Sequence, residues 1–252
     1  MAALAAPVTA RGPWLTAALN ASPAGPLGRV RPLALVVEPH PQGGPDAVAL
    51  LSTRRRGVTT AVTLLGAQVA PLPDGRPQHR LLARDEEAAA RLAAGVADLL
   101  DDLRGPWTLR LAGLPLGDPT VRHLAAALPD SSLATTRSRR LVDELDTVGD
   151  VLRSRDPAEL ERWLPAVLDR VPPVQRPFLR STARLHAAIG QLEVAVVRAA
   201  AGPAAVLLTL VDRRPGGEDR WPWWASSDVG GLRRELGSPS VSLTASAGLI
   251  RR

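Results

Sequence analysis

The fold class is decided by residues 84–128, RDEEAAARLAAGVADLLDDLRGPWTLRLAGLPLGDPTVRHLAAAL. The first part of this stretch repeats apolar residues at helical spacing, at Leu92, Val96, Leu99, Leu100 and Leu103. Residues 85–87 are acidic, and a helix dipole favours negative charge in the first turn. Gly105-Pro106 then stops the pattern, because proline cannot continue a helix. The spacing predicts a helix over residues 84–103.

A strand and a second helix are expected next. Residues 107–111 alternate with period two, which places Trp107, Leu109 and Leu111 on one face of a strand. Asp118-Pro119 supplies an N-cap and a preorganised first residue for a helix that continues to about residue 128. A helix, a strand and a helix in this order indicate a layered α/β domain. We therefore expect an α/β protein with a mixed sheet and with residues 107–111 in the interior of that sheet.

The composition excludes several classes of site. All 31 basic residues are arginine, yet 25 acidic residues leave a net charge of only +6. Arginine without lysine is typical of a GC-rich coding sequence, so we do not expect a nucleic-acid partner. The absence of cysteine excludes disulfides, thiolate nucleophiles and Cys-ligated metals. The four histidines, His40, His79, His123 and His186, lack the spacing of a metal site, and no metal is predicted.

Location is predicted from two apolar stretches. Residues 1–13 lack the basic start and the apolar run of a signal peptide. Residues 199–211 are apolar but are broken by Gly202-Pro203 and are too short to cross a bilayer. We expect a cytoplasmic protein without a membrane span.

The rest of the chain alternates between strand-like and helix-like patterns. Strands are expected at 33–37, 47–53, 58–65, 132–136, 192–197 and 204–211, and a short helix at 13–20. Residues 22–28 are expected to form a loop, residues 137–140 a basic turn, and residues 146–190 a helical segment that Pro165 divides. Beyond residue 212 only 221–225 resembles a strand.

Residues 54–59, Arg-Arg-Arg-Gly-Val-Thr, are the first candidate site. They are similar to the acyl-CoA loops of GNAT acetyltransferases, Arg/Gln-x-x-Gly-x-Gly/Ala, which lie between a strand and a helix and hold a pyrophosphate. Thr59 stands where that pattern has a small residue, and the segment that follows is β-branched. The alternative is a charged turn between two strands. No catalytic base is indicated by the sequence.

Two further candidates carry arginine and tryptophan. Arg176, Arg180 and Arg184 form a stripe on one helix face, which would either bind phosphates or pair with acids such as Glu159 and Glu161. Residues 221–224, Trp-Pro-Trp-Trp, would either stack on a ligand or pack against the helical segment.

The order of these elements resembles the GNAT superfamily, in particular the double-lobed BioF2-like and FemAB-like transferases. The resemblance implies a first GNAT-like α/β lobe at 1–140, a helical linking segment at 141–190 and a partial second lobe with an irregular tail at 191–252. It also implies an acyltransferase that uses acetyl-CoA or another acyl-CoA and an amine or hydroxyl acceptor. The residues that would bind this coenzyme are Arg54, Arg56, Gly57, Val58 and Thr59. The alternative is a non-catalytic, degenerate relative with an interaction or regulatory role; the acceptor and the oligomeric state stay open.

Overall fold

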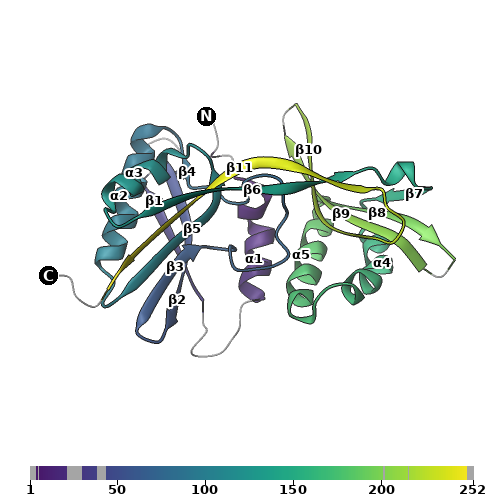
Figure 1. Cartoon of the computed structure of the whole chain (residues 1–252), viewed down its shortest axis with the longest axis horizontal. Coiled ribbons are helices and arrows are strands. Elements are labelled where there is room, and N and C mark those ends of the chain that lie inside the picture. The colour runs from purple at the N-terminus through teal and green to yellow at the C-terminus, as the bar shows by residue number, and fades with distance from the viewer. Residues whose placement is uncertain are drawn as a thin grey trace.

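Two β-sheets, each with helices packed on one face, make up the protein (Figure 1). The computed structural model describes residues 4, 6–21, 30–38, 44–200, 202–214 and 216–248, and the loop expected at 22–28 lies outside them. The strands of the first sheet have the order β1-β2-β3-β5-β11-β6, and those of the second the order β10-β9-β8-β7. The expected mixed α/β class is therefore confirmed.

The elements have the following bounds. The first sheet contains β1 (Arg31–Val37), β2 (Ala47–Arg56), β3 (Thr59–Leu64), β4 (Leu82–Ala83), β5 (Trp107–Pro115), β6 (Ser132–Asp143) and β11 (Leu232–Ala247). The second contains β7 (Val151–Ser154), β8 (Leu192–Ala199), β9 (Gly202–Arg214) and β10 (Gly217–Ser227). The helices are α1 (Gly12–Asn20), α2 (Glu86–Asp101), α3 (Pro119–Ala127), α4 (Pro157–Asp169) and α5 (Arg176–Ala188), with short 3-10 turns at Val8–Ala10, Leu145–Thr147 and Pro173–Gln175.

The helix, strand and helix predicted over residues 84–128 are α2, β5 and α3. Asp85 caps α2 and Asp118 caps α3, each carboxylate accepting a backbone N–H of the first turn. Trp107, Leu109 and Leu111 are buried against these two helices. Because β5 lies between β3 and β11, it is an interior strand, as predicted.

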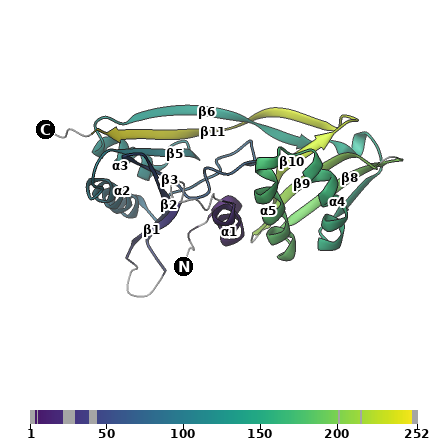
Figure 2. The same ribbon diagram turned by 90° about the horizontal axis from the view of Figure 1, so that it is seen from below.

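The opposite face of the first sheet is open to solvent on two of its strands. Thr108 and Arg110 of β5 are exposed there, and so are Ala34 and Val36 of β1. Figure 2 shows the same arrangement, with β6 and β11 along one side of the molecule and the helices on the other. We call these two paired strands the β6–β11 ribbon; it runs from the first sheet across to the second.

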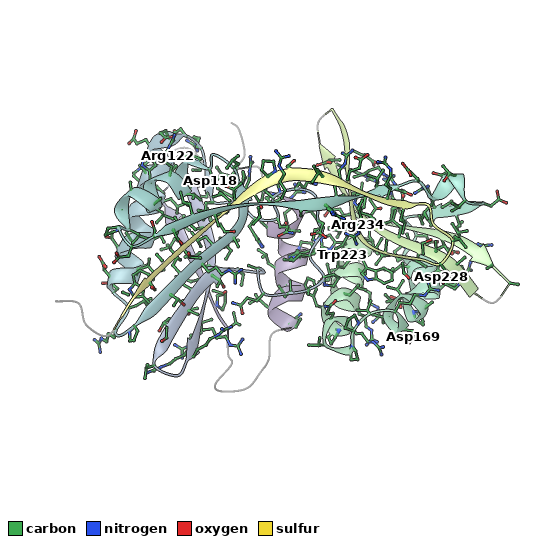
Figure 3. All side chains as sticks on the ribbon, in the orientation of Figure 1. Asp118, Arg122, Asp169, Trp223, Asp228 and Arg234 are labelled. Atoms are coloured by element: carbon green, nitrogen blue, oxygen red, sulfur yellow. The ribbon has the colours of Figure 1, made fainter. Side chains whose placement is uncertain are left out.

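The second sheet is buried on both faces over β8. Its helix side packs against α4, α5 and the N-terminal helix α1, whose Trp14 contacts Phe178 and Trp223 with ring centroids 5.1 and 5.4 Å apart. Figure 3 marks Trp223 near the centre of the molecule. Its other side carries a small cluster around Leu145 and Leu207, which packs against Leu141 and Leu232 of the ribbon. The ribbon therefore acts as the second cover of this sheet.

Three expectations for residues 137–171 were wrong. Residues 137–140 continue strand β6 and do not turn, because each pairs with a residue of β11 or borders the β-bulge there. Residues 151–154 form β7, which pairs with β8, and are not helical. Pro165 does not divide α4, since Leu164 and Val167 are buried on either side of it and this burial offsets one lost hydrogen bond.

The tail expected to be irregular forms the long strands β10 and β11. In β11 the buried residues Val241, Leu243 and Ala245 alternate with serine and threonine. The two-residue period of a strand is therefore present, but it involves only these three buried residues. The boundaries at 140 and 190 do not separate the lobes either, because α1 packs in the second core and β11 lies in the first sheet.

Replacement of Leu109 by alanine should lower the free energy of unfolding by about 2–5 kcal/mol, because its side chain is only 1% exposed. The neighbouring Thr108→Ala, on the exposed face, is the matched control and should change it by less than about 0.5 kcal/mol. Urea unfolding of both variants measures the difference. Equal losses for the two variants would contradict the burial of this strand face.

Candidate functional site

The residues predicted to bind coenzyme lie in a β-hairpin. Arg54 and Arg56 end β2, Gly57 and Val58 form the turn, and Thr59 begins β3. Gly57 has a φ of +61°, which glycine adopts without strain. The alternative of a turn between strands is confirmed. A hairpin turn offers no helix N-terminus for a pyrophosphate, so the loop-and-helix geometry expected of these five residues is not formed.

The helix that follows β3 along the chain is α2, and its N-terminus is acidic. The Asp85 carboxylate accepts a hydrogen bond from the Ala88 N–H at 2.8 Å. Glu86 and Glu87 follow in the first turn. Glu86 accepts hydrogen bonds from Arg122 at 2.7 Å and from His123 at 2.7 Å, and these bonds lower its pKa. Carboxylates thus already use the favourable dipole of this helix, and they would repel a pyrophosphate.

The gap beyond the parallel pairing of β3 with β5 is filled by the chain itself. These strands pair only from Thr60 to Thr63 of β3. Beyond that point the Gln78 and His79 N–H groups donate to the Gly113 carbonyl, at 3.0 and 3.1 Å, and His79 is buried. The hydroxyl of Thr9 donates in turn to the Gln78 carbonyl. A groove with free backbone N–H groups, which an acyl-CoA site would need here, is therefore absent over these residues.

A cleft with a volume of about 640 Å³ lies between the two sheets. Its walls come from the loop at 74–76, from β6 and β11 of the ribbon, and from β10. Its charged lining residues are Asp74, Arg76, Arg137, Arg140, Asp143, Asp219 and Arg220. It is the main candidate binding site of the described part of the chain.

The loop at 74–76 is locked to the ribbon at a contact between two glycines. The Ser238 N–H donates to the Gly75 carbonyl at 2.8 Å, and the Gly75 N–H donates to Ser138 Oγ at 2.8 Å. A Cβ on Gly237 would come within 2.4 Å of the Gly75 oxygen, and one on Gly75 within 2.2 Å of the Arg140 Cβ. The backbones therefore approach as closely as glycine allows.

The same loop is anchored to the second sheet by tryptophan. Trp221 Nε1–H donates to the Asp74 carbonyl at 2.7 Å, and Trp223 Nε1–H donates to the Pro71 carbonyl at 2.8 Å. The Arg76 guanidinium stands 4.4 Å from the centre of the Trp221 ring. Both rings are buried, so the packing alternative is confirmed for two of the three tryptophans in residues 221–224.

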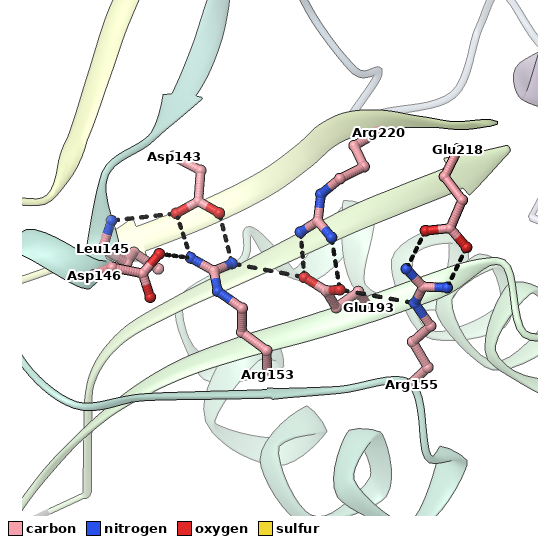
Figure 4. Close-up of polar contacts among 8 residues, drawn as sticks. All are labelled: Asp143, Leu145, Asp146, Arg153, Arg155, Glu193, Glu218 and Arg220. Atoms are coloured by element: carbon pink, nitrogen blue, oxygen red, sulfur yellow. Dashed lines mark hydrogen bonds and ion pairs between the residues drawn. The ribbon is translucent and has the colours of Figure 1, made fainter. Parts of the chain in front are cut away.

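A chain of ion pairs adjoins the cleft at Asp143 and Arg220 and extends over β7, β8 and β10 (Figure 4). Buried Glu193 accepts hydrogen bonds from both terminal nitrogens of Arg220, one of them at 2.9 Å, and lies 3.6 and 3.7 Å from Arg153 and Arg155. Arg153 also contacts Asp143 and Asp146, each at 2.7 Å. Arg155 donates to Glu218 at 2.6 and 2.5 Å, and these bonds lower the pKa of Glu218 to about 2. Three arginines thus face four carboxylates.

The charges that line the cleft are largely balanced. Arg76 pairs with Asp219 at 2.6 Å, Arg140 with Glu235 at 2.6 Å, and Asp74 lies 3.7 Å from Arg234. Every carboxylate of the lining therefore has an arginine partner. No unpaired carboxylate is left in the described lining to serve as a base, and the cleft is suited to binding more than to proton transfer.

The arginine stripe on α5 meets the preceding helix. Arg184 donates to both oxygens of Glu161, at 2.7 and 2.6 Å, and lowers the pKa of that carboxyl. Arg176 Nε donates to the Val171 carbonyl at 2.9 Å. The pairing alternative is confirmed for Glu161 but not for Glu159, which bonds to Arg162 of its own helix.

Two buried histidines were missed as candidates, because a lone histidine in a loop or helix carries no sequence signal of its burial. Burial lowers the pKa of His79 to about 4, and it also lowers the pKa of His186. Within the described ranges no three His, Asp or Glu side chains are grouped as a metal would require. Over the same ranges no helix is long and apolar enough to span a membrane.

Comparison with known proteins does not identify a family. No protein-family model and no curated protein matches the chain. One similar solved structure is a conserved protein of unknown function from Bacteroides thetaiotaomicron, with 8% sequence identity, a TM-score of 0.48, and coverage of 92% of this chain and 88% of that one.

Replacement of Gly75 by alanine should lower the free energy of unfolding by more than about 1 kcal/mol, because its φ is +94° and the added Cβ would collide with Arg140. Gly95→Ala in α2 is the matched control. A Cβ there would meet no atom within 4 Å apart from its chain neighbours and its own helix backbone, so alanine should stabilise the protein by about 0.5–1 kcal/mol. Thermal unfolding measures both shifts. A neutral Gly75→Ala would show that the loop is not locked to the ribbon.

The buried His79 should make the protein less stable in acid. Its pKa falls from 6.5 to about 4 on folding, so between these values the unfolded chain holds a proton that the folded chain lacks. The free energy of unfolding is therefore highest above pH 6.5. It falls, by up to about 3 kcal/mol, as the pH approaches 4. Urea unfolding across this range should give a shallower pH dependence for His79→Leu than for the native chain. An unchanged pH dependence would contradict this role of His79.

Proposed function

We infer that the chain is a non-catalytic, GNAT-like protein whose role is to bind a partner. The observation that carries this proposal is the acidic start of α2, where Asp85 already caps the helix and Glu86 and Glu87 add negative charge. The helix after β3 is the element whose N-terminus would have to hold the pyrophosphate of an acyl-CoA. Three carboxylates at this point oppose such a ligand.

Two further features support the same proposal. The segment at 78–79 occupies the gap beyond the parallel β3–β5 pair, and the residues expected to bind coenzyme lie in an exposed hairpin. The cleft between the sheets is lined by arginines and carboxylates in ion pairs. Such a cleft has polar groups for recognition but no activated group for acyl transfer.

The GNAT-like part of the proposal rests on the order of elements. Strands β3 and β5 are parallel and are joined by helix α2, the arrangement in which a coenzyme groove could open. This arrangement also favours the second candidate function, transfer of an acyl group from acetyl-CoA or another acyl-CoA to an amine or hydroxyl. The two candidates differ in one measurable property, affinity for the coenzyme.

Acetyl-CoA titrated into the protein should give no binding heat and no thermal shift at millimolar concentration. A ligand at one hundred times its dissociation constant would add about 2.7 kcal/mol of stability and would be readily detected. Release of free CoA thiol in the presence of mixed amines should not exceed the rate without protein.

The acyltransferase candidate predicts the opposite result. Saturable binding that is lost in Arg54→Ala/Arg56→Ala, but kept in the matched Arg31→Ala/Arg104→Ala, would assign the coenzyme to the hairpin and overturn the non-catalytic proposal. Each double variant removes two arginines from the described part of the chain, so both change the net charge equally.

A further inference from the structure

One charged side chain of the cleft between the sheets has no counter-charge among the described residues. The charged lining residues are Arg76, Arg137, Arg140, Arg220, Asp74, Asp143 and Asp219. Three of the four arginines are ion-paired, and their partners are Asp219, Glu235 and Glu193. Arg137 is exposed and forms no ion pair with any residue that the structure describes. Since every lining carboxylate has an arginine partner, the lining carries one unbalanced positive charge.

The lining also offers a ligand more hydrogen-bond donors than acceptors. A guanidinium carries five N–H groups, whereas an ionised carboxylate only accepts. The Asp143 carboxylate already accepts from two nitrogens of Arg153 and from the Leu145 N–H, at distances of 2.7 to 3.2 Å. Arg140 donates to Glu235 through Nε and Nη2 and keeps the donors of Nη1. A ligand that brings acceptors, which an anion does, therefore suits this lining better than a cation.

A buried hydroxyl belongs to the wall that the second sheet contributes. Thr209 of β9 is 1% exposed and lines the cleft. Its neighbours Leu208 and Leu210 lie in the helix-side core, and side chains alternate along a strand, so Thr209 lies on the opposite face. On that face Leu207 packs in the small cluster beneath the ribbon, whereas Thr209 borders the cleft. The second sheet thus supplies a group that can donate or accept a hydrogen bond.

Apolar side chains lie beside Arg137 at an irregularity of the ribbon. The pairing of β11 with β6 shifts between Leu236 and Pro239, so that two residues of β11 stand opposite Ser138 alone. Bulges of this kind redirect side chains and are frequent beside active sites. Leu236, which is 70% exposed, and Pro239 both line the cleft, and Pro239 pairs directly with Arg137. Apolar surface is therefore available next to the unbalanced guanidinium.

The charge and the volume of the cleft select the class of ligand. One unbalanced positive charge matches one negative charge, and a carboxylate is a singly charged group that a guanidinium binds through two parallel hydrogen bonds. An inorganic anion would leave most of the 640 Å³ unfilled and Leu236 uncovered. A nucleic acid would need several unpaired arginines for its phosphates, and the described lining has one.

We propose that this cleft binds a small organic acid with a single carboxylate and an apolar body. Arg137 holds the carboxylate through its guanidinium, and Leu236 and Pro239 cover the apolar body. The Thr209 hydroxyl is the partner for a polar group on the side of the ligand that faces the second sheet. This inference rests on the proposed binding role and names the class of molecule that is bound.

The test is isothermal titration calorimetry of the native chain with two carboxylates, octanoate and phenylbutyrate. Their primary amides are matched controls that keep the apolar body and lose the charge, and inorganic phosphate is a control that has charge and no apolar body. At least one carboxylate should bind. Its amide should bind at least about tenfold more weakly, because the guanidinium then lacks a charged acceptor. Phosphate should also bind at least about tenfold more weakly, because it covers no apolar surface.

Two arginine variants locate the carboxylate. Arg137→Gln should weaken binding of the tighter carboxylate by at least about tenfold. Arg139→Gln is the matched control, because Arg139 is exposed on the same strand, forms no ion pair with a described residue and is not part of the cleft lining. It should weaken binding by less than about twofold, since solvent screens a charge outside the site. Circular dichroism and the thermal midpoint show that both variants fold.

Two leucine variants locate the apolar body. Leu236→Ala removes an exposed side chain of the cleft lining and should weaken binding by at least about threefold. Leu133→Ala is the matched control, because Leu133 is an exposed leucine of the same ribbon that lies outside the lining. It should leave the affinity unchanged.

Several outcomes would overturn the organic-acid site. They are no binding of either carboxylate, equally tight binding of the amides or of phosphate, and equal effects of the two members of either variant pair. If neither the carboxylates nor acetyl-CoA bind, only the organic-acid site fails. If acetyl-CoA binds through the hairpin and the carboxylates do not bind, the non-catalytic proposal fails as well. If both bind, with the carboxylates lost in Arg137→Gln, the organic-acid site stands and the non-catalytic proposal fails.

Discussion

Antiparallel pairing of β11 with both β5 and β6 is the interaction on which the rest of the structure depends. Through β11 the chain returns to its first sheet after completing the second, and the β6–β11 ribbon then spans both. The N-terminal helix α1 makes the reverse connection, since its Trp14 lies in the core formed by α4, α5 and the second sheet. Each lobe is therefore completed by a segment from the far end of the sequence.

The cleft between the lobes follows from this exchange. The ribbon forms one wall, and the loop anchored by Trp221 and Trp223 forms another. Arginine lines these walls because the chain has no lysine, and its planar guanidinium can engage two oxygens at once, as Arg220 does with Glu193. Paired charges of this kind fix the relative position of strands, but they leave few groups free for chemistry.

Local signals in the sequence account for what could be predicted. Asp85, Asp118 and the alternation from Trp107 to Leu111 act over a few residues, so they identified α2, β5 and α3 correctly. Strand β11 could not be found in the same way, because only Val241, Leu243 and Ala245 are buried in it and its register depends on partners far away in sequence. The motif at 54–59 shows the converse limit: Gly57 suits a phosphate loop and a hairpin turn equally well, and only the segment that follows distinguishes them.

The exchange of segments also affects how the chain folds during synthesis. Strands β5 and β6 leave the ribosome well before β11, with residues 144–231 made in between. Until β11 arrives, two strand edges that later face it have no partner, and such edges are prone to wrong pairing. Many contacts are far apart in sequence, which slows folding. In a nascent chain these two edges therefore stay unpaired until Leu232–Ala247 has been made.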